Sequence, residues 1–271
     1  MKMILMGKKS YCGQVLEWSL RKNIEILGVV TNDNCVVSIA KKYRIPVISI
    51  EQAEQLVKKN IVDIVVSYLY WKRIREPLIS GPRLGCINFH PAILPDWRGM
   101  GGYNIAILNK LEKWGATAHY VDSTIDTGNI IRIFRFDFDF REETAYSLEE
   151  KTQKIQVDLY KSVMLDILNN GRIKCEKQDS TLGTYVSKNE MEQLKKIDIE
   201  KDDIDLKIRA FWFPPYDGAN IVINNQVYTL INKEILSQIA QVFKNKRCFI
   251  GEFDEYEKYT GGGRQLLSRS A

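Results

Sequence analysis

Short, nearly continuous apolar runs alternate with longer amphipathic segments through the first half of the chain. The runs at residues 3–6, 24–30 and 47–50 are each followed by a segment whose apolar residues recur at helical spacing. Continuous apolar runs are typical of strands that are buried on both faces of a parallel sheet. The pattern therefore predicts an α/β fold, with a Rossmann-like, mostly parallel sheet and helices on both faces. The predicted strands are residues 3–6, 24–30, 47–50, 63–68, 85–89, 115–121 and 129–138, and the predicted helices are residues 10–22, 36–43, 51–60, 103–111, 145–168 and 202–210.

The pattern changes near residue 180, where a polar stretch replaces the alternation of strands and helices. Residues 219–232 alternate around an Asn-Asn pair, which predicts a β-hairpin. We expect a smaller C-terminal subdomain that contains this hairpin. The predicted division is an α/β domain over residues 1–180, the small subdomain over 181–260 and a loose tail over 261–271.

Composition narrows the choice of partners. The net charge of +5 is spread along the 271 residues without the dense basic stripe of a nucleic-acid-binding protein. No run of about 18 apolar residues occurs, so we expect no membrane insertion. Residues 7–13 (GKKSYCG) match neither a dinucleotide fingerprint nor a P-loop, so we expect neither NAD nor ATP. The number of cysteines is odd, they form no CxxC pair and the chain has two histidines, so we expect no metal site and the reduced thiols of a cytoplasmic protein.

The segment CINFHPAILP is the first candidate for chemistry. Asn88 and His90 are two residues apart in a predicted strand, so their side chains point to one face. Pro91 and Pro95 restrict the backbone where it leaves the sheet, at the end where parallel sheets bind ligands. An Asn amide can donate to a developing oxyanion, and a His can accept or donate a proton. The alternative is a loop His that bonds a backbone carbonyl.

A second candidate, VDSTIDTG, follows about 35 residues later between two predicted strands. Asp126 in this segment would orient the imidazole of His90 if the two side chains meet. The alternative is a turn in which the Asp bonds its own backbone. His119, in the preceding strand, is interpreted as structural, and an indirect role beside the site stays open.

Together, NFHPAILPDWRG and IDTGNI resemble the folate-dependent formyltransferases. The likeness covers residues 60–170 in sequence and the first 60 in architecture. It implies that residues 1–180 form the formyltransferase domain, that N10-formyltetrahydrofolate is the cosubstrate and that Asn88, His90 and Asp126 are catalytic. Asn88 and His90 would polarise the formyl carbonyl, and either His90 or Asp126 would take the proton of the attacking amine.

The resemblance also implies a folate slot between the end of the predicted strand 63–68 and the loop 121–126. Ordinary packing is the alternative for the two tyrosines. The candidate cofactor-binding residues are Ser67, Tyr68, Leu69, Tyr70, Asp122 and Ile125.

The segments RGMGGYN and IRAFWFPPYDGAN resemble a subgroup that formylates nucleotide-linked amino sugars for surface polysaccharide such as lipopolysaccharide O-antigen. Aromatic side chains would stack on a base and basic ones would meet a diphosphate. The alternative for FWFPPY is a hydrophobic plug between the two domains. The candidate substrate-binding residues are Lys8, Lys9, Arg98, Met100, Gly102, Tyr103, Asn104, Arg209, Trp212, Phe213 and Tyr216.

The expected acceptor is dTDP-4-amino-4,6-dideoxyglucose. The alternatives are a dTDP-3-amino-3,6-dideoxyhexose, methionyl-tRNA or glycinamide ribonucleotide, hydrolysis of formylfolate, and a folate-binding protein without activity. The C-terminal part is shorter than the tRNA-binding domain of methionyl-tRNA formyltransferases, which favours a sugar. The family also suggests a homodimer formed through the hairpin.

Overall fold

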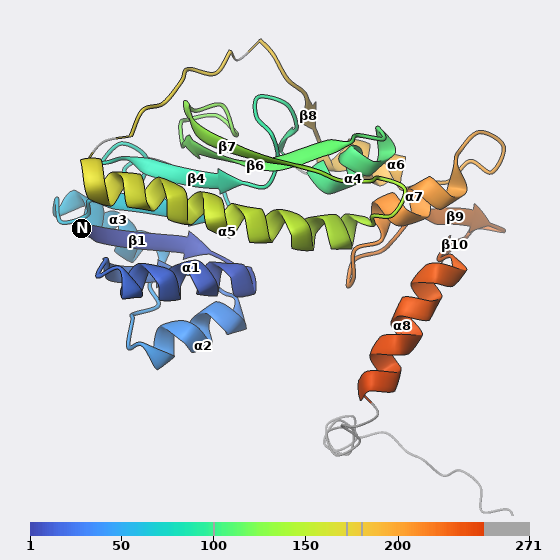
Figure 1. Ribbon diagram of the computed structural model, residues 1–271, viewed down its shortest axis with the longest axis horizontal. Helices are drawn as coiled ribbons and strands as arrows, with labels where there is room; N and C mark the ends of the chain where they lie inside the picture. Colours follow the sequence, from blue (N-terminus) through green and yellow to red (C-terminus); the bar gives the residue numbers. More distant parts are fainter. Residues whose placement is uncertain (100, 172, 180, 247–271) are drawn as a thin grey trace, which may run out of the picture. The chain divides into compact units, whose positions relative to one another are not determined.

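The computed structural model of the chain describes residues 1–99, 101–171, 173–179 and 181–246 (Figure 1). Met100, a predicted substrate contact, and the predicted tail 261–271 lie outside the described residues. The chain divides into two compact units, residues 1–229 and residues 230–271. The boundary predicted near residue 180 therefore falls inside the first unit.

A six-stranded sheet forms the centre of the first unit, with the strand order β2-β1-β3-β4-β6-β7. The four strands from β2 to β4 are parallel, and β6 and β7 are antiparallel to their neighbours. The predicted Rossmann-like, mostly parallel sheet is thus confirmed. The strands are β1 (Lys2–Gly7), β2 (Glu25–Val30), β3 (Ile64–Tyr68), β4 (Cys86–His90), β6 (Lys113–Tyr120) and β7 (Ile130–Asp137).

One predicted strand, residues 47–50, is wrong. It contributes only an isolated bridge between Val47 and Val29. Ser49 and Gln52 form a capping box, which starts helix α3 (Ile50–Lys58) where the strand was expected to continue.

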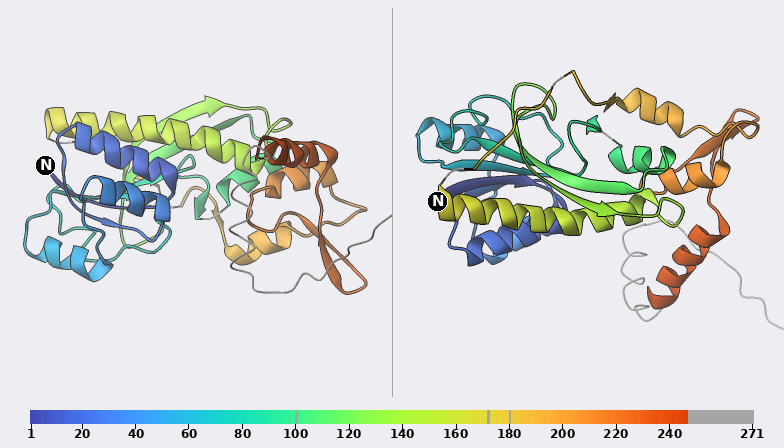
Figure 2. Two further views of the ribbon diagram at one scale, coloured as in Figure 1. Left: turned by 90° about the horizontal axis from the view of Figure 1, so that it is seen from below. Right: turned by 45° about the horizontal axis from the view of Figure 1, so that its top comes forward.

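Helices cover both faces of the sheet, as predicted. Helices α1 (Lys9–Arg21) and α5 (Ala145–Asn170) run side by side along one face, and α2 (Asn34–Lys42) packs next to α1 (Figures 1 and 2). Their apolar residues join Tyr68 and Phe89 of the sheet in one core. The apolar residues of α3 pack with those of the opposite face, such as Val65 and Cys86. The polar site described below lies on this α3 face.

The remaining elements belong to the first unit, apart from one helix that lies in the second. The helices α6 and α8 and the two-residue strand β5 were not predicted, and the predicted hairpin is confirmed as β9 and β10. Within the described part of the chain, no helix combines the length and the apolar character that crossing a membrane requires. These elements are β5 (Arg98–Gly99), α4 (Gly102–Leu108), β8 (Tyr185–Val186), α6 (Lys188–Leu194), α7 (Ile204–Phe211), β9 (Asn220–Ile223), β10 (Gln226–Thr229) and, in the second unit, α8 (Lys233–Lys246).

Candidate active site

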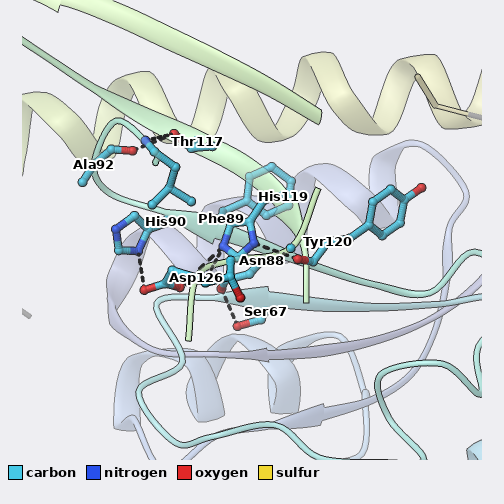
Figure 3. A network of polar contacts seen from close by, with 12 residues as sticks. Ser67, Asn88, Phe89, His90, Ala92, Thr117, His119, Tyr120 and Asp126 are labelled. Carbon is cyan, nitrogen blue, oxygen red and sulfur yellow. Dashed lines mark hydrogen bonds and ion pairs between the residues drawn. The ribbon is translucent and has the colours of Figure 1, made fainter. Parts of the chain in front are cut away.

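Strand register assembles the first part of the site. Asn88 on β4 is paired with Ser67 on β3 and with His119 on β6. Residues at paired positions of neighbouring strands project from the same face, so the three side chains form a row across the sheet (Figure 3). His90, two residues after Asn88, projects from the same face, while the side chain of Phe89 enters the opposite core.

Asp126 reaches this row from the loop between β6 and β7. Its Oδ2 lies 3.5 Å from Nδ1 of His90, and its Oδ1 lies 3.5 Å from Nδ2 of Asn88. The backbone amide of Gly99 donates to Oδ2 at 3.1 Å. The structure therefore brings Asn88, His90 and Asp126 together, as the spacing of the two motifs required.

The carboxylate of Asp126 is ionised at neutral pH. Burial by itself would raise its pKa. The charge of His90, contacts with His119 and the hydrogen bond from Gly99 outweigh burial and hold the pKa of Asp126 well below its ordinary value. The site thus contains a buried carboxylate against two imidazoles, which is an arrangement suited to orienting an imidazole and stabilising its protonated form.

The loop that carries Asp126 has an unusual backbone. Asp126 has a φ of 55°, in the left-handed region that non-glycine residues seldom adopt. Gln178, which is buried, donates from Nε2 to the carbonyl oxygen of Gly128 at 2.5 Å and to that of Asp126 at 3.2 Å. A side chain on Gly128 would meet the carbonyl oxygen of Tyr120 at 1.8 Å, so only glycine fits there.

The two histidines have different surroundings. The Nε2 atom of His90 is 3.1 Å from the carbonyl oxygen of Trp97, so the backbone contact considered from the sequence occurs together with the Asp126 contact. His119 is 2% exposed, and its Nε2 lies 3.1 Å from Asn88 Nδ2 and 3.5 Å from Asp126 Oδ1. The indirect position that the sequence left open for His119 is therefore the observed one.

Five of the six residues predicted to bind folate pack in the two cores or bond other residues of the site and its loop. Ser67 bonds Asn88, and Tyr68 is buried in the opposite core, so ordinary packing holds for the Tyr68 side chain. Leu69 and Tyr70 are half-buried and pack against the two cores. Asp122 accepts hydrogen bonds from Thr124 and Thr127 and so stabilises its own loop.

Ile125 is exposed and borders an open cavity of about 390 Å³. The cavity adjoins the loop 121–126 predicted for folate, but none of the residues 67–70 predicted for the other side of the slot lines it. Arg73 also donates to the carbonyl oxygen of Ser123 in this loop. The other residues that line the cavity are Arg73, Arg98, Thr124, Thr127 and Tyr185.

Three of the predicted substrate contacts have structural partners instead. Arg209 is 8% exposed and bonds Asp205 and the carbonyl oxygens of Phe140 and Glu143, so its guanidinium does not face a diphosphate. Asn104 donates to the carbonyl oxygen of Ala210 and so ties α4 to α7. Arg98 donates to the carbonyl oxygen of Leu182, although it also borders the cavity beside Ile125. Gly102 begins α4 close to the ring of Trp114.

Other predicted contacts gather in an aromatic and cationic cluster, which consists of Lys9, Tyr103, Phe213 and Tyr216. The rings of Tyr103 and Phe213 are stacked with centroids 6.4 Å apart, and Tyr216 lies 5.8 Å from Phe213. Lys9 is 5.1 Å above the ring of Phe213 and forms an ion pair with Glu149. Lys8 lies over the exposed ring of Trp71 instead, and Trp212 is half-buried, with its carbonyl bonded to the amide of Tyr146.

Three contributors to the site were not recognised from the sequence. Gly99 acts through its backbone amide, Gln178 reaches in from a polar stretch without a pattern, and the hydroxyl of Ser67 was assigned to folate. The register of β3 against β4 would have placed Ser67 beside Asn88. No signal in the sequence identifies Gln178.

Comparison with known proteins defines the class. The family model described as "Formyl transferase" matches residues 4–164, which is more than half of the chain. The chain therefore belongs to the formyl transferase family and is a folate-dependent formyltransferase. The sequence is 26% identical over 250 residues to the methionyl-tRNA formyltransferase of Thermotoga maritima, covering 83% of this chain and 76% of that protein.

Two solved structures of N-formyltransferases share the fold. A 4-N formyltransferase from Francisella tularensis is 25% identical, with a TM-score of 0.72, over 85% of this chain and 96% of that one. An N-formyltransferase from Helicobacter canadensis, solved with folinic acid and dTDP-3-aminofucose, is 25% identical, with a TM-score of 0.71, over 83% of this chain and 85% of that one. The predicted family and fold are thus confirmed, and the predicted cosubstrate, N10-formyltetrahydrofolate, is that of the family.

Proposed function

We propose that the chain transfers the formyl group of N10-formyltetrahydrofolate to the amino group of a nucleotide-linked amino sugar. The observation that carries the proposal is the convergence of Asn88, His90 and Asp126 on one face at the end of the parallel strands. The expected acceptor is dTDP-4-amino-4,6-dideoxyglucose, and the product would serve the synthesis of surface polysaccharide such as lipopolysaccharide.

The reaction needs a donor to oxygen and an acceptor of a proton. The amine nitrogen attacks the formyl carbon, a carbon–nitrogen bond forms and negative charge develops on the formyl oxygen. The bond to N10 then breaks, so the amine loses one proton and N10 gains one. In our proposal, the amide of Asn88 and the imidazole of His90 stabilise the oxygen. Asp126, ionised and held against His90, keeps the imidazole in place and stabilises its protonated form when His90 accepts the proton of the amine.

Folate would occupy the cavity beside the loop 121–126. The cavity has an apolar wall at Ile125 and basic side chains at Arg73 and Arg98, which suit the flat ring and the acidic tail of a folate. Ile125 thus keeps its predicted assignment, whereas Ser67 and the side chain of Tyr68 are better explained by the interactions described above.

Two observations favour an amino sugar on a nucleotide over methionyl-tRNA. The likeness to the Helicobacter N-formyltransferase that was solved with dTDP-3-aminofucose extends over 85% of that chain, against 76% of the Thermotoga methionyl-tRNA formyltransferase. The cluster of Lys9, Tyr103, Phe213 and Tyr216 also offers rings to a base and a cation to a phosphate.

An acceptor panel tests this assignment. The purified chain is incubated with N10-formyltetrahydrofolate and, separately, with dTDP-linked 4-amino and 3-amino dideoxyhexoses, glycinamide ribonucleotide and methionyl-tRNA. Mass spectrometry then looks for the addition of one formyl group. Formylation of the 4-amino sugar alone is the expected result. Turnover of methionyl-tRNA without turnover of any sugar nucleotide would replace the proposed acceptor.

We also propose that the hairpin joins two copies of the chain. Val222 and Val227 are directly paired on one face of the hairpin and are 57% and 68% exposed. Ile223 and Tyr228 are half-exposed on the other face of the hairpin. An apolar surface of this kind fits an isologous contact. Light scattering should show a dimer for the wild type and a monomer for Val227→Glu, and an unchanged mass would exclude this interface.

A further inference from the structure

The row formed by Ser67, Asn88 and His119 has a defined direction of hydrogen bonding (Figure 3). The hydroxyl of Ser67 donates to Oδ1 of Asn88 at 2.7 Å. At the other end, Nδ1 of His119 lies 2.8 Å from the carbonyl oxygen of Tyr120, which can only accept, so Nδ1 carries a hydrogen. In the neutral ring, Nε2 then has the lone pair and accepts from Nδ2 of Asn88 at 3.1 Å, which is closer than its 3.5 Å contact with Oδ1 of Asp126.

This row fixes which way the carboxamide of Asn88 faces. Its oxygen is turned to Ser67, and one of its two N–H groups is turned to His119. The second N–H points toward Oδ1 of Asp126 at 3.5 Å, which is too long for a strong hydrogen bond. That N–H is therefore the one free to bind a developing oxyanion between Asn88, His90 and Asp126.

A carboxamide turned by 180° would present its oxygen to the oxyanion, so the two orientations have opposite effects on the reaction. Shape alone barely distinguishes them, because the oxygen and the amino group have almost the same size. The distinction must come from hydrogen-bond partners. A serine hydroxyl can donate or accept, so the lone pair of His119 Nε2 selects the orientation by accepting from an N–H of Asn88. The hydroxyl of Ser67, which is 2% exposed, then donates to the carboxamide oxygen that faces it.

We propose that Ser67 is a positioning residue, whose hydroxyl holds the carboxamide of Asn88 with an amino hydrogen toward the reacting formyl oxygen. The inference rests on the proposed role of Asn88 in the reaction. It replaces the folate contact expected for Ser67, because a side chain buried beneath Asn88 reaches a ligand only through that residue.

A double-mutant cycle tests the inference. Asn88→Ala alone should lower kcat about 100-fold or more, as expected for an oxyanion donor. Ser67→Ala alone should lower kcat about tenfold, with the KM for N10-formyltetrahydrofolate unchanged within about twofold. Because Ser67 acts through Asn88, the double variant should be no slower than Asn88→Ala. Ser67→Thr, which keeps the hydroxyl, should recover most of the lost kcat.

Ser19→Ala is the matched control. Ser19 is also buried, and its hydroxyl donates to the carbonyl oxygen of Val15 and contacts Tyr160 on the opposite face of the sheet. This variant should lower the unfolding midpoint in urea to a similar extent as Ser67→Ala while kcat stays at the wild-type value. Circular dichroism of all variants checks that they are folded.

The outcomes distinguish a failure of the inference from a failure of the proposed function. If Ser67→Ala slows the Asn88→Ala enzyme by the same factor as the wild type, Ser67 acts independently of Asn88 and the inference fails while the proposed function stands. A rise in the KM for formylfolate with an unchanged kcat would restore the folate contact. If Asn88→Ala keeps most of its rate, the role of Asn88 and the inference fall together.

Discussion

Gln178 holds the loop that presents Asp126, and its removal offers a quantitative test of the site. Its amide donates to the carbonyl oxygens of Asp126 and Gly128, on either side of Thr127. Asp126 has a left-handed backbone, which costs a non-glycine residue about 1–2 kcal/mol. The two hydrogen bonds together contribute about 2 kcal/mol, so they offset that cost.

We therefore expect Gln178→Ala to lower the free energy of unfolding by about 2 kcal/mol. If the whole loss of about 2 kcal/mol destabilised the catalytic conformation of the loop, the population of that conformation relative to other conformations would fall about 30-fold. Gly99 still donates to Asp126 in the variant and retains part of the preference. The expected fall in kcat is thus about tenfold, with little change in the KM for either substrate.

The assay combines urea unfolding with steady-state kinetics. Val163→Ala on α5 is the control, because Val163 is fully buried in the core against the opposite face and its truncation also costs about 2 kcal/mol. This control should be destabilised to a similar extent and keep its kcat. If Gln178→Ala and Val163→Ala lose kcat equally, the loss reflects general stability, and the positioning of Asp126 by Gln178 is refuted.

Gln178→Glu sharpens the test through pH. A carboxylate there would face two carbonyl oxygens, so burial and these acceptors would raise its folded pKa above the unfolded value of about 4.3. The protonated acid can still donate to one carbonyl, and this stability is lost as the pH rises through the folded pKa. The deficit relative to wild type should therefore be larger at pH 7 than at pH 4. A deficit that does not depend on pH would show that the side chain has turned away.

Three further predictions concern the reacting and binding groups. His90→Ala should abolish turnover and leave the urea midpoint nearly unchanged, and a variant with most of its rate would exclude His90 from the reaction. The pKa of Asp126 is lowered on folding, so its carboxylate stabilises the fold fully above its ordinary value of 3.8 and loses that effect as the pH falls below it. The difference in unfolding free energy between wild type and Asp126→Asn should therefore shrink below pH 4, and a constant difference would contradict the lowered pKa. Phe213→Ala should raise the KM for the sugar nucleotide about tenfold or more and leave that for formylfolate unchanged, whereas an equal rise in both with reduced stability would indicate the hydrophobic plug.

The fold could be predicted where the hydrophobic pattern of the sequence is strongly periodic. Continuous apolar runs located the strands of the parallel sheet, and the long amphipathic pattern located α5. The strand predicted at 47–50 failed because four apolar or small residues fit a strand and a helix start equally well. The capping box of Ser49 and Gln52 decided for the helix. Helix α6 lies in polar sequence, where helical periodicity is harder to separate from a loop. In α8, Ile235, Leu236 and Ile239 recur at helical spacing and could have predicted the helix.

The site residues could be predicted where the type and spacing of their side chains are distinctive. Asn88, His90 and Asp126 carry rare or distinctive groups next to strand ends, so their convergence followed from the fold. Arg209 was misassigned because its charge suggested a diphosphate, whereas the structure uses its several N–H groups for buried carbonyls between α7 and the segment before α5. The sequence shows that a cation is present, but only the packed structure shows which hydrogen-bond acceptors it contacts.

The row of Ser67, Asn88 and His119 is assembled by strand pairing, which the sequence alone does not specify. Ser67, Asn88 and His119 lie far apart in the chain, and each is unremarkable alone. Parallel and antiparallel pairing places all three at one level of adjacent strands. A shift of one residue in either pairing would turn the neighbouring side chain to the other face of the sheet and leave Asn88 without one of its two partners. Strand register is therefore part of the active site, because it sets the direction in which the only carboxamide of the row donates.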